Sequence, residues 1–154
     1  MPFHIVLYQP EIPQNTGNIA RTCAVTGAVL HLIHPLGFSL DEKHLKRAGL
    51  DYWQEVDVRE YPDWETFRTI HSQARLFYYS TKGRRWYTEV QYKPGDFLVF
   101  GPETRGLPEA LLREGGHHVL RIPMRPGLRS LNLANTVALV LYEALRQTGF
   151  PGLV

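Results

Sequence analysis

FHIVLYQPEIPQNTGNIARTCAVTGAVLHLIH, residues 3–34, contains a complete strand–helix–strand unit. Phe3–Tyr8 and Val29–His34 are rich in β-forming residues and predict two strands, the first of them buried. Thr16–Thr26, which ends before Gly27, predicts the helix between them. Two consecutive strands joined through a helix usually pair in parallel, so this stretch favours a parallel sheet.

The same alternation of strands and helices continues to the end of the chain. It predicts an α/β fold, a parallel sheet with helices on both faces. Without an internal repeat or a linker, one domain is expected to fill residues 1–154. The further predicted strands are Glu55–Arg59, Arg75–Ser80, Phe97–Phe100 and Val119–Ile122, and the further helices are Asp41–Gly49 (capped by Ser39 or Asp41), Asp63–Ser72, Leu107–Glu114 and Ser130–Gln147.

Composition excludes several classes of protein. With 44% hydrophobic and 21% charged residues, the chain is expected to be globular rather than disordered. The single cysteine, Cys23, excludes an intrachain disulfide, and no Cys/His cluster has zinc spacing, so no metal is expected. The first strand starts at Phe3 and no apolar run approaches the ~20 residues of a membrane span. We therefore expect a soluble cytoplasmic protein.

Arginine dominates the positive charge. The net charge is only +2, yet 13 of the 17 cationic residues are Arg. Guanidinium groups bind phosphate in a planar, bidentate way, so this bias suits an RNA partner. A GC-rich genome would produce the same bias, and composition alone does not separate the two explanations.

Three segments leave the carboxyl ends of predicted strands, where parallel α/β sheets bind ligands. In the first, Pro10–Arg21, Asn15 or Thr16 is expected to cap the helix and leave an anion site at its first turn. Arg21 follows about one and a half turns into the helix and points either into the cleft or to solvent. An ordinary cap with a surface arginine is the alternative interpretation. The segment has no G-x-G-x-x-G pattern, which disfavours a Rossmann or flavodoxin-type nucleotide enzyme.

The second segment, Phe100–Pro108, follows an apolar strand. Gly101 has no side chain and would let a ligand approach the backbone. Two prolines stiffen the loop around Glu103 and Arg105, and a plain turn needs neither. These features indicate a binding loop, with a plain turn as the alternative.

The third segment, Ile122–Asn135, enters the last helix. Ser130 is the expected cap of that helix, whose apolar residues recur at helical spacing. Asn has poor helix propensity, so Asn132 is better explained by a polar partner at the cleft. Local capping by Asn132 and Asn135 is the alternative.

The stretch Lys82–Tyr87 mixes cations with aromatic rings. Arg84 and Arg85 suit phosphates, and Trp86 suits stacking on an unpaired base. A solvated loop anchored by one tryptophan is the alternative.

In this order, Asn15 to Arg21, Phe100–Pro108 and Ile122–Asn135 resemble the three motifs of the SPOUT RNA methyltransferases. The resemblance is to the TrmH-like branch, and within it to the TrmL group, which methylates the ribose 2′-hydroxyl of the tRNA wobble nucleotide. It extends over nearly the whole chain, including Leu7–Pro13, Arg47–Tyr52 and Tyr142–Ala144.

The resemblance implies a SPOUT fold whose C-terminal third forms a deep trefoil knot, although general topology rules make knots very rare. It also implies a homodimer with the knot at its interface. The cofactor would be S-adenosylmethionine, bound within the knot loops. Mapped onto this sequence, its shell comprises Tyr79, Gly101, Ile122 and Ser130.

The activity implied is 2′-O-methylation of tRNA at nucleotide 34, a cytidine or uridine of the anticodon. Arg21 is the family's catalytic candidate, and we assign it the orientation of the 2′-hydroxyl and phosphate, because arginine does not lose its proton near neutral pH. Asn15 is expected to support Arg21, and Glu103, Ser130 and Asn132 are expected to shape the site. Methylation of another tRNA or rRNA site, or RNA binding without catalysis, are the competing hypotheses.

Overall fold

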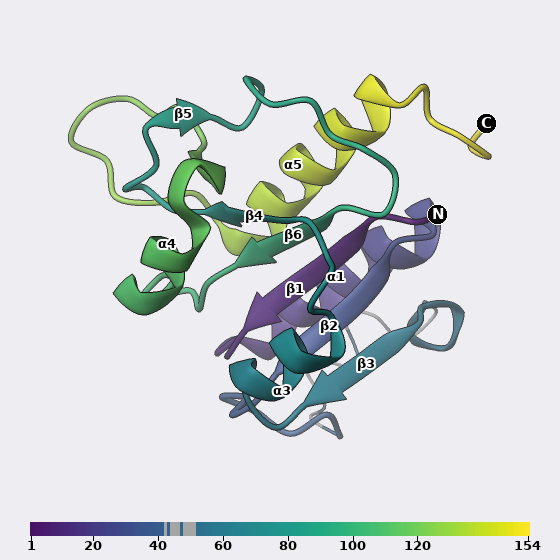
Figure 1. Ribbon diagram of the computed structural model, residues 1–154. Helices are drawn as coiled ribbons and strands as arrows, with labels where there is room; N and C mark the ends of the chain where they lie inside the picture. The colour runs from purple at the N-terminus through teal and green to yellow at the C-terminus, as the bar shows by residue number, and fades with distance from the viewer. Residues whose placement is uncertain (42, 44–46, 48–51) are drawn as a thin grey trace.

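The computed structural model describes residues 1–41, 43, 47 and 52–154, and a parallel seven-stranded sheet forms its centre (Figure 1). The strand order is β3-β2-β1-β6-β4-β7-β5, and every neighbouring pair is parallel. The predicted parallel α/β architecture is therefore confirmed. The strands are β1 (His4–Tyr8), β2 (Val29–Ile33), β3 (Val58–Tyr61), β4 (Leu76–Tyr79), β5 (Arg85–Trp86), β6 (Phe97–Phe100) and β7 (Val119–Arg121).

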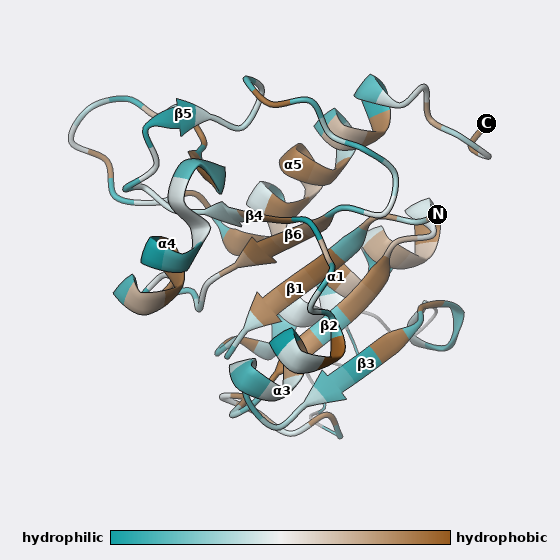
Figure 2. Ribbon diagram, in the orientation of Figure 1, coloured by the Kyte–Doolittle hydropathy of each residue, from teal (hydrophilic) through white to brown (hydrophobic). Residues whose placement is uncertain are grey.

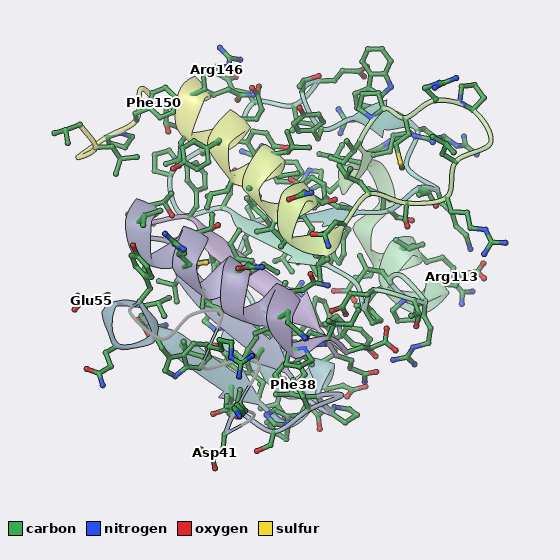
Figure 3. The ribbon with its side chains drawn as sticks, turned by 180° about the vertical axis from the view of Figure 1, so that it is seen from behind. Phe38, Asp41, Glu55, Arg113, Arg146 and Phe150 are labelled. Carbon is green, nitrogen blue, oxygen red and sulfur yellow. The ribbon has the colours of Figure 1, made fainter. Side chains whose placement is uncertain are left out.

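Helices cover both faces of the sheet. On one face lie α1 (Pro13–Thr26) and α5 (Leu133–Gln147), which contact each other and are seen in front in the reverse view of Figure 3. On the other face lie α3 (Trp64–Ile70) and α4 (Glu109–Gly115). Two 3₁₀ turns complete the described elements, η1 (Trp53–Glu55) and η2 (Gly116–His118).

Each face has its own core, because successive strand residues point to opposite sides. In β1, Ile5 and Leu7 pack on the α1/α5 side, whereas Val6 packs on the α3/α4 side. Cys23 lies fully buried in the first core. Figure 2 shows the apolar residues concentrated in the central strands and in α5. The two cores fix the sheet firmly and leave its carboxyl edge to the loops.

Both predicted caps beside the candidate site are wrong. Helix α1 begins at Pro13, with Ile12 as an N-cap that forms no side-chain cap bond, so Asn15 lies inside the helix. Proline is favoured at this first position because it needs no hydrogen-bond acceptor and its φ is already helical. Helix α5 begins at Leu133 and is capped by Asn132. The side-chain oxygen Oδ1 of Asn132 accepts a hydrogen bond from Asn135 N at 3.1 Å. The cap of α5 is therefore not Ser130.

Other boundaries also differ from the predictions. The third strand is Val58–Tyr61 rather than Glu55–Arg59, because Trp53–Glu55 forms a 3₁₀ turn first. Strand β5 was not predicted, as it consists of two residues inside a polar loop. The helix predicted at Asp41–Gly49 lies largely outside the described residues, as does most of the stretch from Arg47 to Tyr52.

Among the described helices, none combines the length and apolar character that crossing a bilayer requires. In the same part of the chain, no cluster of three or more His, Cys, Asp or Glu residues is arranged to hold a metal ion.

Candidate active site at the carboxyl edge of the sheet

Glu103 connects the loop after β6 to the start of α1. One carboxylate oxygen accepts a bond from Glu11 N at 2.8 Å, and the other accepts from Ile12 N at 2.8 Å and from Asn15 Nδ2 at 3.2 Å. A carboxylate at a helix N-terminus is favoured by the helix dipole, and charged acceptors form strong bonds. Glu103 thus supplies from a distant loop an acceptor that the N-cap residue itself lacks.

Asn15 extends this connection to the third segment. Its amide nitrogen donates to Glu103, while its carbonyl oxygen accepts a bond from Asn132 Nδ2 at 3.2 Å. Asn132 in turn caps α5. Three polar side chains therefore join the three segments singled out in the sequence. The partners of Asn15 are Glu103 and Asn132, and not Arg21, which it was expected to support.

Glu11 forms a second connection that sequence reasoning missed. Its Oε1 accepts bonds from Thr104 N and Thr104 Oγ1, both at 2.8 Å, and Arg105 Nε lies 3.7 Å from its Oε2. The backbone and side-chain bonds from Thr104 hold the pKa of Glu11 below its usual value. The sequence did contain a signal: Glu11 is a carboxylate between two prolines, and the loop Phe100–Pro108 carries a carboxylate and a guanidinium between prolines as well.

Gly101 is required by its own loop. A Cβ placed there would lie 2.3 Å from Leu107 N and 2.5 Å from the carbonyl carbon of Gly106. Gly106, with φ of 69°, donates its N–H to Pro102 O at 2.9 Å and turns the chain back onto Gly101. Close packing of the backbone therefore explains why a glycine is needed at position 101. The approach of a ligand to this glycine stays a prediction.

The other three residues predicted for the cofactor shell differ in surroundings. The Tyr79 ring is buried, stacks on Phe100 at 4.7 Å and bonds Tyr92 through its hydroxyl, so a ligand has access only to its backbone. Ile122 is half-buried against the α1/α5 core. Ser130 is exposed, and its hydroxyl bonds none of the residues that the structure describes.

Arg21 lies exposed on α1. Its guanidinium carbon lies 4.7 Å from the centroid of the Tyr52 ring, and Nη2 lies 3.5 Å from the Tyr52 hydroxyl. Stacking on an aromatic face orients a guanidinium while leaving N–H groups available to a phosphate or hydroxyl. Tyr52 was not predicted as a site residue, although it ends the quoted stretch Arg47–Tyr52.

The basic aromatic stretch borders a cavity of about 560 Å³ at the end of β7. Trp86 is 51% exposed and lines it together with Arg84, Arg121 and Met124. Arg85, the preceding residue of β5, donates instead to His117 O. Residues 84 and 86 therefore share one cavity, and Arg85 lies apart from it.

The chain is similar along its whole length to known RNA methyltransferases. Residues 2–142, which contain all three segments, match the SpoU rRNA Methylase family. Over 151 residues the chain is 54% identical to a tRNA (cytidine(34)-2′-O)-methyltransferase of Saccharophagus degradans, covering 97% of this chain and 98% of that protein. A solved structure concerned with 2-OH methylation of C/U34 on tRNA has a TM-score of 0.91 at 51% identity, over 96% of both chains. An AdoMet-bound rRNA methyltransferase from Sinorhizobium meliloti has a TM-score of 0.85 at 26% identity, over 94% of this chain and 56% of that one.

Proposed function

This chain belongs to the SpoU rRNA methylase family, and we propose that it transfers a methyl group from S-adenosylmethionine to the ribose 2′-hydroxyl of tRNA nucleotide 34, a cytidine or uridine. The observation that carries this proposal is its similarity, over almost its full length, to enzymes that are named for that reaction. In this proposal the enzyme acts on tRNA in the cytoplasm, and residues 1–154 form a single domain.

The chemistry of the carboxyl edge fits S-adenosylmethionine. Ile122 offers a half-buried apolar surface for an adenine, the backbone at Gly101 and Tyr79 offers polar groups, and the Ser130 hydroxyl is unused among the described residues. When bound, the cofactor supplies a methyl group on a positively charged sulfur. The joined loops would hold these contacts in fixed positions, and pre-positioning of reactants lowers the barrier.

Arg21 acts on the RNA side of the reaction. Stacked on Tyr52, its guanidinium orients the 2′-hydroxyl and an adjacent phosphate, because it donates planar, charged hydrogen bonds. Glu103, Asn15 and Asn132 are positioning residues, since their side chains bond one another or backbone across the three segments. Ser130 lies on the segment entering α5, where its hydroxyl is available to the cofactor.

The cavity beside Trp86 receives the anticodon loop. The exposed indole of Trp86 is suited to stack on an unpaired base, while the guanidinium of Arg84 is suited to bind a phosphate. Leu139 and Tyr142 are exposed apolar side chains one turn apart on α5, and they support a homodimer because neighbouring exposed apolar side chains can form part of an interface patch. The trefoil knot of the C-terminal third is proposed from membership of the family.

The test is methylation of defined tRNA by the purified protein. A transcript with C34 or U34 should gain one 2′-O-methyl at that nucleotide, as mapped by mass spectrometry of nuclease fragments. The matched control carries a 2′-deoxyribose at nucleotide 34 only, and it should accept no methyl. Methylation elsewhere in the tRNA would reassign the substrate position, and tight binding of both cofactor and tRNA without transfer would favour the non-catalytic hypothesis.

A further inference from the structure

A second cavity, of about 290 Å³, lies between the Lys82–Arg85 segment and the turn that joins α4 to η2. Positive charge dominates its lining, in which Glu109 is the only carboxylate among the described residues. The cations are Lys82, Arg84, Arg85 and Arg113. A hollow lined by one sign of charge concentrates the field and attracts ions of the opposite sign.

The cavity is formed before any ligand arrives. Gly83 N donates to Ser80 O at 3.0 Å, and a Cβ on Gly83 would lie 2.5 Å from the carbonyl carbon of Leu120, so this wall is packed on β7. Arg85 donates to His117 O and ties that wall to η2. A preformed site loses less entropy when it binds.

Three of the cations have no partner among the residues that the structure describes. The side chains of Lys82, Arg84 and Arg113 form no ion pair or hydrogen bond with the residues that the structure describes. Other arginines do: Arg68 bonds Glu114 at 2.8 Å, and Arg146 bonds Glu143 at 2.9 Å.

Arg113 even lies one turn from Glu109 without pairing with it. Figure 3 shows Arg113 at the outer edge of the molecule. Like charges gathered around a hollow repel one another, and a bound anion would relieve that repulsion.

Both cavities share Lys82, Gly83 and Arg84. Successive residues of a strand point to opposite faces, so β5 presents Trp86 to one cavity and Arg85 to the other. β5 is also the edge strand of the sheet. A single-stranded nucleic acid crossing this edge would therefore meet a stacking surface and a cationic hollow next to each other.

We propose that the second cavity is a phosphate subsite for the tRNA backbone, in which Arg113 is the outer cation and the bound phosphate flanks the nucleotide stacked on Trp86. The subsite rests on the proposed function, because it takes tRNA to be the substrate. It extends the RNA path from the loop after β4 to α4, which lies on the opposite face of the sheet from α1 and Arg21.

The experiment compares two substitutions one helical turn apart on α4. Affinity for an anticodon stem-loop RNA is measured by filter binding across a potassium chloride series. Arg113→Gln should weaken binding by roughly 3- to 10-fold at low salt, and the slope of log K against log salt should become shallower by about 0.7, the loss of one phosphate contact on a single strand. Glu109→Gln, which removes the opposing carboxylate, should tighten binding.

Arg146→Gln is the control for an exposed arginine far from the cavity (Figure 3), and it should match the wild type. All three variants should keep the wild-type affinity for S-adenosylmethionine, and Arg146→Gln should also keep the wild-type single-turnover rate. A wild-type slope in Arg113→Gln would overturn the subsite, whatever the enzyme methylates.

A second arm separates RNA phosphate from free phosphate. Inorganic phosphate is added to the wild type and to Arg113→Gln without RNA, and thermal unfolding is followed. Stabilisation that depends on Arg113, together with an unchanged RNA slope, would assign the cavity to a small anion and overturn the proposal. Conversely, a shallower slope in a protein that binds tRNA without methylating it would support the subsite and contradict the proposed function.

Discussion

Glu103 illustrates how one side chain holds backbone from a different segment. Its carboxylate accepts hydrogen bonds from the backbone N–H groups of Glu11 and Ile12 and from the side-chain amide of Asn15. Glu103 itself lies on the loop after β6, 88 or more residues away from these donors in sequence. An amide at this position has one acceptor oxygen and turns an N–H₂ group toward a second donor. The effect of changing Glu103 therefore depends on the second oxygen, and not on the size of the side chain.

We expect Glu103→Gln to destabilise the fold by about 1–3 kcal/mol, the usual cost of leaving a partly buried donor unpaired. That loss corresponds to a melting temperature roughly 2–12 °C lower in a chain of this size. Differential scanning calorimetry of Glu103→Gln beside Glu89→Gln, the same substitution at an exposed position outside any helix, measures it. Equal melting temperatures for the two variants would show that the Glu103 bonds contribute little.

Arg21 is predicted to serve the reaction and not cofactor binding. Arg21→Ala should keep the wild-type affinity for S-adenosylmethionine in calorimetry and reduce single-turnover methylation by ~100-fold or more, the scale of a positioned charged group. Arg21→Lys should rescue poorly, because a point charge does not reproduce the planar guanidinium.

Tyr52→Phe is the matched control for Arg21. It removes the hydroxyl that lies 3.5 Å from Nη2 and keeps the aromatic ring on which the guanidinium stacks. The rate should therefore fall far less than in Arg21→Ala. Near wild-type turnover in Arg21→Ala would remove this arginine from the active site, and loss of cofactor binding would give it a structural role.

At the scale of elements, a chain of hydrogen bonds crosses from β1 through β2 and β3 to the end of α3. His4 Nδ1 lies 2.8 Å from His31 Nε2, His31 Nδ1 lies 2.7 Å from the Tyr61 hydroxyl, and that hydroxyl lies 2.9 Å from His71 Nε2. Neutral rings satisfy all three bonds, each with one donor. Burial, followed by the charge of Arg59, lowers the pKa of His4 to about 4. Burial also lowers the pKa of His31 to about 2 and that of His71 below its usual value.

These shifts predict a fold that loses stability in acid. A lowered pKa in the folded state means that, below the ordinary pKa of about 6.5, the unfolded chain binds protons that the folded chain excludes. The stabilisation is fully present above pH 6.5 and falls as the pH drops toward 4. For the buried His31 alone the slope approaches about 1.4 kcal/mol per pH unit. Urea unfolding between pH 8 and pH 5 measures this dependence.

Two variants assign the acid sensitivity to this chain of bonds. His31→Phe removes the most buried titrating ring. This variant should be less stable than the wild type at pH 8, and its free energy of unfolding should depend less on pH. His71→Phe removes the last ring of the same chain of bonds and should also reduce the pH dependence. A slope shared by the wild type and His31→Phe would contradict the assignment.

Elements with strong local signals could be predicted from the sequence, and elements made by distant partners could not. Strand β6 was predicted with its observed bounds, Phe97–Phe100, because an apolar run lies between turn residues. Strand β5 exists only through its pairing with β7, since two residues carry no period. The cap of α5 was misplaced because Ser130 and Asn132 are both good caps, and the choice depends on where the loop packs.

At the scale of the whole molecule, the same limit applies to the site. The sequence singled out Asn15, Glu103 and Asn132, because polar residues at strand ends and in poor helical positions require a reason. Their partners are 88 and 117 residues apart and follow from the fold alone. No observed contact joins Asn15 to Arg21 among the described residues, and the partners of Asn15 come from the other two segments.

The proposed homodimer gives the final prediction, which concerns whether one active site is built from two subunits. Arg21 lies on α1, whereas the residues assigned to the cofactor lie at the ends of β4, β6 and β7 and before α5. Within one chain, no described hydrogen bond or ion pair joins Arg21 to Gly101, Ile122 or Ser130. If each arginine serves the cofactor of the partner, Arg21→Ala and a cofactor-deficient Ser130 variant carry defects that a mixed dimer separates.

Co-expression of Arg21→Ala and Ser130→Ala chains with different affinity tags, followed by two-step purification, would yield verified heterodimers. One site in each heterodimer then combines an intact arginine with an intact Ser130. Single-turnover methylation should recover toward half of the wild-type amplitude, while both variant homodimers stay inactive. An inactive heterodimer that still binds one equivalent of S-adenosylmethionine would instead mean that Arg21 serves the cofactor of its own subunit, because each chain then carries one of the two defects in its own site.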